Sequence, residues 1–165
     1  MTLQFLLTAW LLSPSQPLVQ APVLPEMRGF RLGASIEAVG GRSLPCQNID
    51  GRRACDTRDS VRLFFDNGRL SDIVVQFGIR PIGAKDRWFA LTDSLEHLFG
   101  KPDSVAMRSD GLTAYWGSMS KAAPWLRTFS VIELRSGTHV ASTAWLSLFG
   151  CIEPTQGSLC ADLLR

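Results

Sequence analysis

Apolar and polar residues alternate along residues 61–77, which is the pattern of a β-hairpin with one buried face. Asn67-Gly68 supplies the turn, and a two-residue loop there would mix apolar and charged residues on each face. A three-residue loop with Gly68 in the left-handed conformation instead pairs Val61 with Ile73. We predict this register, which gathers on one face Val61, Leu63, Phe65, Ile73, Val75 and Phe77.

A second hairpin is indicated by the segment Cys46–Cys55, which is centred on Asp50-Gly51. Counting outward from a two-residue turn, Ile49 faces Arg52 and Cys46 faces Cys55 as a close, non-hydrogen-bonded pair. Two cysteines in this position lie within reach of a disulfide.

A third hairpin is expected around Gly137, between residues 129–134 and 138–148. A three-residue loop would place Glu133 opposite His139, with Ile132, Leu134 and Val140 on the core side.

Two short helices are predicted from capping residues. Ser35 is placed to cap a helix that Gly40-Gly41 ends, and a second helix over 92–99 ends at Gly100, where Pro102 bars its continuation.

The same order of elements occurs twice along the chain. Ser94-Leu95-Glu96 repeats Ser35-Ile36-Glu37, and each is followed by segments with the patterns of strands. Chance recurrence of common turn residues is the alternative. We predict an α+β fold, an antiparallel sheet with short helices packed on one face, built from two tandem helix-plus-four-strand units over residues 26–82 and 83–165.

The N-terminus has the features of a secretory leader. Residues 3–12 are almost entirely apolar, no charged residue precedes Glu26, and Pro and Ser residues follow. The stretch is too short to cross a membrane as a helix, and no later window is long enough. We predict a signal peptide over 1–21, with a buried N-terminal segment as the alternative.

The four cysteines agree with export. They form two local pairs, and we predict the disulfides Cys46–Cys55 and Cys151–Cys160. A zinc site is the competing interpretation, but the closely spaced cysteine knuckles it needs are missing. We therefore expect a periplasmic or secreted protein.

Composition and motifs argue against several functions. A net charge of +2 gives no reason to expect a nucleic-acid partner. Ser118 and Lys121 match the S-x-x-K of serine acyl-enzymes, but the companion motifs stand in the wrong order. His97 and His139 are expected to be structural, and no known nucleotide- or metal-binding motif occurs. We predict no enzyme, no metal and no cofactor.

An apparent insertion near residues 117–127 is the most informative stretch for partners. Tyr115, Trp116 and Trp125 flank it, and such side chains commonly carry binding energy at interfaces. The alternative is that the tryptophans cover a sheet edge. We expect Trp116 to be buried at the end of a strand and Trp125 to be the better contact residue.

The string from Phe30 to Val39, FRLGASIEAV, resembles the F-x-x-G-M-[ST]-x-x-x-V opening of small bacterial envelope domains. These are the SmpA/OmlA-type outer-membrane assembly lipoproteins and the similar beta-lactamase inhibitory proteins, which are tandems of helix-plus-four-strand units. Cys46 and Cys55 match the cysteine placement of the inhibitors, whereas Ala34 replaces the usual Met. The resemblance implies binding or assembly rather than catalysis.

Together these features predict an exported, non-catalytic domain that binds another envelope or secreted protein. A protein that binds a small molecule or a cell-wall fragment on a concave sheet face is the alternative, and an enzyme comes third. The sequence indicates no oligomeric state.

Overall fold

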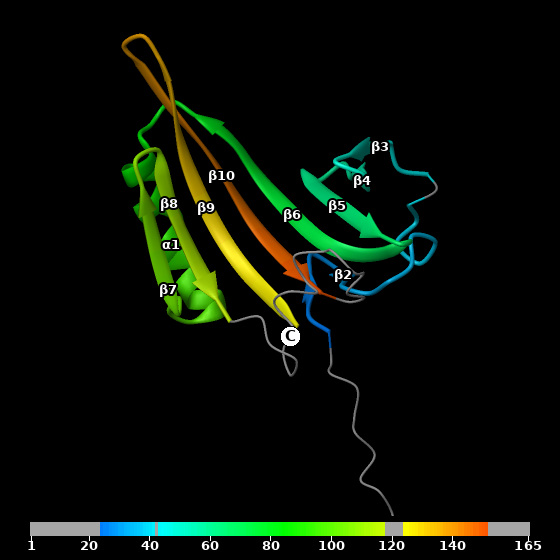
Figure 1. The fold of residues 1–165 in the computed structure, drawn as a ribbon. Coiled ribbons are helices and arrows are strands. Elements are labelled where there is room, and N and C mark those ends of the chain that lie inside the picture. The colour runs from blue at the N-terminus through cyan, green and yellow to red at the C-terminus, as the bar shows by residue number, and fades with distance from the viewer. Residues whose placement is uncertain (1–23, 42, 118–123, 152–165) are drawn as a thin grey trace, which may run out of the picture.

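The computed structural model describes residues 24–41, 43–117 and 124–151. Of these residues, 55% are in strands and 13% are in one α-helix. Eight strands form a single antiparallel sheet in the order β3-β4-β5-β6-β10-β9-β8-β7, and β1 pairs with β2 separately (Figure 1). The elements are β1 (Glu26–Met27), β2 (Phe30–Arg31), β3 (Cys46–Ile49), β4 (Arg52–Asp56), β5 (Val61–Asp66), β6 (Arg69–Arg80), α1 (Ala84–Phe99), β7 (Ser104–Arg108), β8 (Gly111–Trp116), β9 (Trp125–Ser136) and β10 (His139–Gly150).

The predicted α+β fold of two tandem helix-plus-four-strand units is wrong, because the structure is mostly β with one helix and one large sheet. The helix expected after Ser35 is a series of turns. Backbone groups of this segment bond to β6 and its turn instead: the Ile36 N–H donates to the Gly68 carbonyl at 3.1 Å, and the Leu70 N–H donates to the Ala34 carbonyl at 2.9 Å. These bonds replace those of a short, marginal helix.

The helix α1 begins eight residues earlier than predicted and packs one side against the sheet. The ring of Trp88 lies 5.4 Å from that of Phe129, and Phe99 meets Trp116 edge-on at 6.0 Å. At the start of α1 the Ala84 N–H donates to the carboxylate of Glu133, a residue of β9, at 3.2 Å. A side chain from the sheet therefore serves where a local capping residue is missing.

Arg87 ties α1 to the two central strands. Its guanidinium is buried and donates to the Ser142 carbonyl of β10 and the Phe77 carbonyl of β6, both at 2.8 Å. Burial lowers the pKa of Arg87, and the charge of nearby Arg80 lowers it further. These two hydrogen bonds hold the first half of α1 against β6 and β10.

The hairpin of β5 and β6 has the predicted buried face but not the predicted register. Asn67 and Gly68 form a two-residue loop, both with positive φ, so that Asp66 pairs with Arg69. A bulge follows, and beyond it Val61 pairs with Val75 rather than with Ile73. The extra residue of β6 returns the apolar side chains of both strands to one face.

The hairpin of β9 and β10 also differs from its prediction. His139 pairs with Ser136 across a two-residue loop, so Glu133 does not face His139. Leu134 and Val140, expected in the core, are exposed. They lie near the tip of the hairpin, which extends beyond the neighbouring strands (Figure 1).

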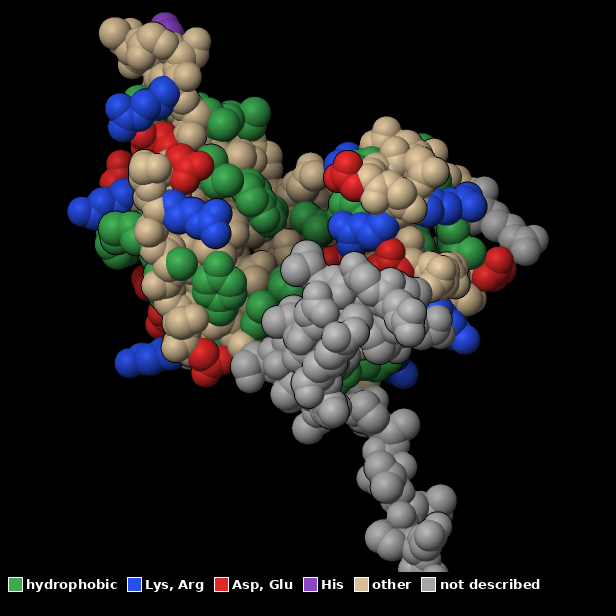
Figure 2. Space-filling model, in the orientation of Figure 1, with side chains coloured by type: hydrophobic (Ala, Val, Ile, Leu, Met, Phe, Trp, Pro, Cys, Tyr) green, Lys and Arg blue, Asp and Glu red, His purple; other side chains and the backbone are tan. Residues whose placement is uncertain are grey.

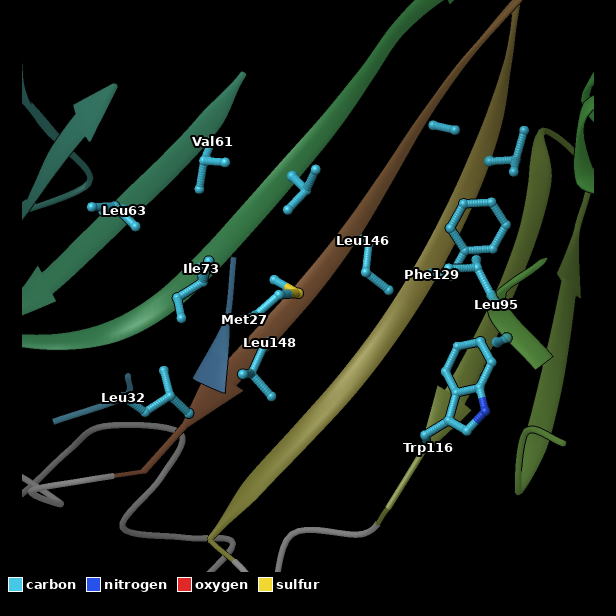
Figure 3. Close-up of a cluster of buried hydrophobic side chains, with 14 of the residues drawn as sticks. Met27, Leu32, Val61, Leu63, Ile73, Leu95, Trp116, Phe129, Leu146 and Leu148 are labelled. Carbon is cyan, nitrogen blue, oxygen red and sulfur yellow. The ribbon is translucent and has the colours of Figure 1, made fainter. Parts of the chain in front are cut away.

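The core lies on one face of the sheet, which we call the helix face. In Figure 3, Met27 and Leu32 from the N-terminal segment pack near Ile73 and Leu148 of the central strands. Because α1 packs on Phe129 of the same face, the N-terminal segment and the helix share this side of the sheet. We call the opposite side the open face, since among the described residues no helix or strand packs on it.

The disulfide Cys46–Cys55 is confirmed, and the two residues are direct partners in the β3–β4 ladder. Cys151 is disulfide-bonded as well, but its predicted partner Cys160 lies outside the described residues. The predicted signal peptide, 1–21, also lies outside them. In the described part of the chain, no helix has the length and hydrophobicity to cross a membrane.

Candidate functional site

The open face is built by strand alternation, which turns every second side chain away from α1. Strand pairing then aligns these side chains into rows that run across the sheet. One row holds Tyr115, Thr128, Ser147, Val74 and Arg62. A second row holds Thr113, Ser130, Trp145 and Gln76. A third row holds Leu126, Phe149, Asp72, Phe64 and Ala54.

The half of the open face formed by β8, β9 and β10 carries aromatic rings and hydroxyl groups. Within residues 111–115, 126–134 and 141–149, none of the side chains that point to this face is charged. The rings of Tyr115, Trp145 and Phe149 are half-buried. The hydroxyls of Thr113 and Ser130 share a hydrogen bond of 3.1 Å. Such a surface presents flat apolar area beside groups that can donate or accept a hydrogen bond.

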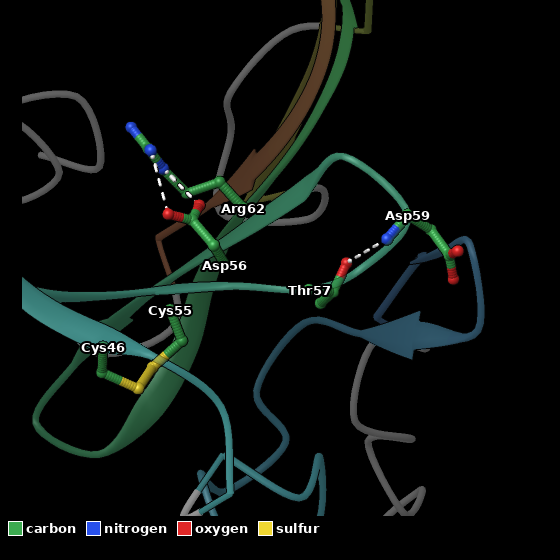
Figure 4. A network of polar contacts seen from close by, with 6 residues as sticks. All are labelled: Cys46, Cys55, Asp56, Thr57, Asp59 and Arg62. Atoms are coloured by element: carbon green, nitrogen blue, oxygen red, sulfur yellow. Dashed lines mark hydrogen bonds and ion pairs between the residues drawn. A yellow bond between two sulfur atoms is a disulfide. The ribbon is translucent and has the colours of Figure 1, made fainter.

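The other half of the open face, on β4, β5 and β6, carries paired charges. Arg52 donates to Asp72 at 2.7 Å, and its guanidinium stacks 4.7 Å above the ring of Phe64. Arg62 donates to both carboxylate oxygens of Asp56, at 2.7 and 3.0 Å (Figure 4). These pairs leave little uncompensated charge on this half.

Electrostatics shift the pKa of two charged groups in this half, Asp72 and Arg62. Burial raises the pKa of Asp72, although hydrogen bonds from the Ser71 hydroxyl and from Arg52 oppose the shift. The hydrogen bond to Asp56 raises the pKa of the Arg62 guanidinium.

The open face borders a hollow in the outline of the molecule (Figure 2). Figure 2 views the molecule from this side and shows a hollow at its top, between the part formed by β6–β10 and the part formed by β3–β5. The uncharged strands β8–β10 lie on one side of this hollow, and Arg52, Asp56 and Arg62 of β4 and β5 lie on the other.

The structure separates the three binding residues predicted from the sequence. Tyr115 lies on the open face, whereas Trp116, the next residue of β8, points into the core. The expected burial of Trp116 is confirmed: its indole N–H donates to the Gly100 carbonyl at 2.9 Å. Trp125 is half-buried on the helix face, with the guanidinium of Arg127 6.0 Å from its ring. The three residues do not form one patch.

Arg127 itself belongs to the helix face. Its guanidinium lies 3.9 Å from the centre of the Phe99 ring, and burial lowers its pKa. Its buried Nε has no hydrogen-bond partner among the described residues. We infer that Arg127 stabilises the packing of the C-terminal end of α1 on the sheet, where its cation faces the rings of Phe99 and Trp125.

Residues with catalytic potential are dispersed in the structure. His97 lies in the last turn of α1 and His139 near the tip of the β9–β10 hairpin, and both are exposed. Ser118 and Lys121 lie outside the described residues. Within the described ranges, no three His, Cys, Asp or Glu side chains come close enough to hold a metal ion.

Sequence reasoning missed Trp145, Phe149 and Phe64 as surface residues. In β10 the rings alternate with Leu146 and Leu148, so both faces of the strand are apolar, and the pattern does not say which face is buried. A strand with two apolar faces is itself a signal, because an antiparallel sheet usually has one polar face.

Comparisons with known proteins found no matching family model, no matching curated protein and no matching solved structure.

Proposed function

We propose that the protein is an exported, non-catalytic binding domain that holds another envelope or secreted protein on the open face of its sheet. The observation that carries this proposal is the uncharged half of that face, where aromatic rings and hydroxyls stand in rows across three strands. Tyr and Trp bury large areas and lose few rotamers on binding, so they are effective anchors when a rigid sheet holds them.

Export is supported by the cysteines. Cys46 and Cys55 are bonded, and disulfides of this kind persist in oxidising compartments such as the periplasm and the extracellular space. We place the protein there, with the predicted leader of residues 1–21 directing its export.

A protein partner fits the open face better than a small ligand. Small-molecule sites enclose their ligand in a cavity with converging polar groups. An open depression of about 330 Å³ lies on β3 and β4, and the described residues that line it, Cys46, Gln47, Asn48 and Arg53, include no aromatic ring. The aromatic rows spread across the sheet instead of converging, as contact residues for a broad partner surface do.

The test is capture of partners from an envelope extract with purified protein as bait. Trp145→Ala and Phe149→Ala should each weaken the affinity for the captured protein by at least about 30-fold, the level of a hot-spot residue. Leu98→Ala removes an exposed apolar side chain of α1, on the other side of the sheet, and serves as the matched control. Equal loss of affinity in all three variants, or loss in the control alone, would contradict the proposal.

A further inference from the structure

Strand β7 forms one edge of the eight-stranded sheet. Among the described residues no strand pairs with its outer side. The opposite edge, β3, is four residues long and is tied to β4 by the disulfide. β7 is five residues long, contains neither Pro nor Lys, and has Arg108 at its end as its one charged residue. Natural proteins usually blunt such edges because they pair with other strands.

The hydrogen-bonding pattern shows which groups of β7 face outward. The Glu133 N–H donates to the Asp110 carbonyl at 2.7 Å, so the even-numbered residues of β8 bond to β9. The odd-numbered residues of β8 therefore bond to β7, where their partners are the even-numbered residues. Val105 and Met107 are left with N–H and C=O groups that point away from the sheet.

The side chains at this edge are apolar and exposed. Val105 is 51% exposed and Met107 is 80% exposed, and both lie on the helix face of β7. Phe89, 61% exposed, lies on the flank of α1 turned toward this edge, because the other flank carries Arg87 toward β6 and β10.

We propose that β7 pairs antiparallel with β7 of a second copy of this chain, about a two-fold axis through Ala106. In this register Val105 of each copy faces Met107 of the other. Both are residues with outward backbone groups, so the two pairs are hydrogen-bonded pairs and place apolar side chains together on the helix face.

The strand is suited to a copy of itself for three reasons. The outward-pointing residues coincide across the two-fold axis, the apolar side chains oppose each other, and Ser104 rather than a like charge faces Arg108. A two-fold axis perpendicular to the sheet joins the two sheets edge to edge and presents both open faces on the same side. The dimer would thus offer two binding faces to one partner assembly.

The test is the oligomeric state of the oxidised, full-length protein by sedimentation velocity. Because a single strand pair buries little area, we expect a reversible dimer that is populated at about 100 μM and dissociates on dilution. Met107→Lys should weaken the dimer at least about tenfold, because the charge opposes apolar Val105 twice in each dimer. Asn48→Lys adds the same charge at the β3 edge and should leave the dimer unchanged.

A charge-swap variant tests the register. Val105→Glu combined with Met107→Lys places opposite charges across the axis and should restore dimers, whereas Val105→Lys combined with Met107→Lys should stay monomeric. The proposal is overturned if the unmodified protein remains a monomer at about 100 μM, or if Met107→Lys dimerises as well as the unmodified protein. It is equally overturned if the swap variant behaves like the double-lysine variant.

Discussion

The division of β8 into a core side and an open side predicts opposite roles for two adjacent residues, Tyr115 and Trp116. Trp116 is 5% exposed, packs edge-on against Phe99 and donates its indole N–H to the Gly100 carbonyl. Truncating a buried Trp to Ala costs about 3–5 kcal/mol, and the unpaired carbonyl adds to that cost. Tyr115 is half-buried on the open face, and Tyr115→Ala should cost less than about 1.5 kcal/mol.

Urea unfolding followed by far-ultraviolet circular dichroism measures both costs. With a slope of about 2 kcal/mol per M, Trp116→Ala should lower the midpoint by about 2 M and Tyr115→Ala by less than about 0.8 M. Trp116→Phe keeps an aromatic ring beside Phe99 but loses the hydrogen bond, so its midpoint should lie between those of the unmodified protein and Trp116→Ala. If Tyr115→Ala destabilises the fold as much as Trp116→Ala does, the assignment of faces is refuted.

Three further predictions concern the supports of the sheet. Arg87→Met leaves the Phe77 and Ser142 carbonyls without their donors and should lower the free energy of unfolding by about 1–3 kcal/mol in urea titrations. Hydrogen bonds from Ala84 and Arg135 hold the pKa of Glu133 below its usual 4.5, so the carboxylate stabilises the fold above that pH and loses this effect as the pH falls through the lowered folded-state pKa. The stability difference between the unmodified protein and Glu133→Gln, measured by thermal melts from about pH 3 to about pH 7, should therefore be greatest at the upper end and shrink toward the lower end. Replacing Cys46 and Cys55 together by Ala opens a loop of about ten residues and should cost about 2.7 kcal/mol from chain entropy, again measured by urea unfolding.

Local patterns were sufficient for the hairpin of β3 and β4 and for the buried face of the β5–β6 hairpin. Asp50-Gly51 fixes a two-residue turn, and the register of Cys46 with Cys55 follows by counting. The β5–β6 register was missed because a bulge lets a two-residue Asn67-Gly68 turn coexist with one apolar face. Counting outward from a turn cannot reveal such an extra residue.

The helices were misjudged because their determinants lie far away in the sequence. The segment after Ser35 is not helical, because its backbone groups form hydrogen bonds with residues 68–70. The helix α1 starts at Ala84, where the Glu133 carboxylate of β9 accepts a hydrogen bond from the backbone N–H. Helix propensities and capping residues describe only the local sequence, so they do not include hydrogen bonds to residues that are distant along the chain.

The open face likewise depends on long-range pairing. β10 lies between β6 and β9, and its residues Leu146 and Leu148 are buried under α1 and the N-terminal segment. Because side chains alternate along the strand, Trp145 and Phe149 then point to the open face. From the sequence alone, either set of side chains could have been the buried one. Three aromatic residues close together in the sequence predicted a binding site: Tyr115, Trp116 and Trp125. Strand alternation assigns Tyr115 to the open face and both tryptophans to the helix face.

Site-specific photo-crosslinking can show which face of the sheet the partner occupies. A benzoylphenylalanine introduced at Ile132, on the uncharged half of the open face, and another at Leu98, on the outside of α1, would each be illuminated in cells that express the protein. We expect a discrete crosslinked product with a second protein from the Ile132 position and none from the Leu98 position. A product from Leu98 with none from Ile132 would contradict binding through the open face, because the partner would then lie on the helix face of the sheet.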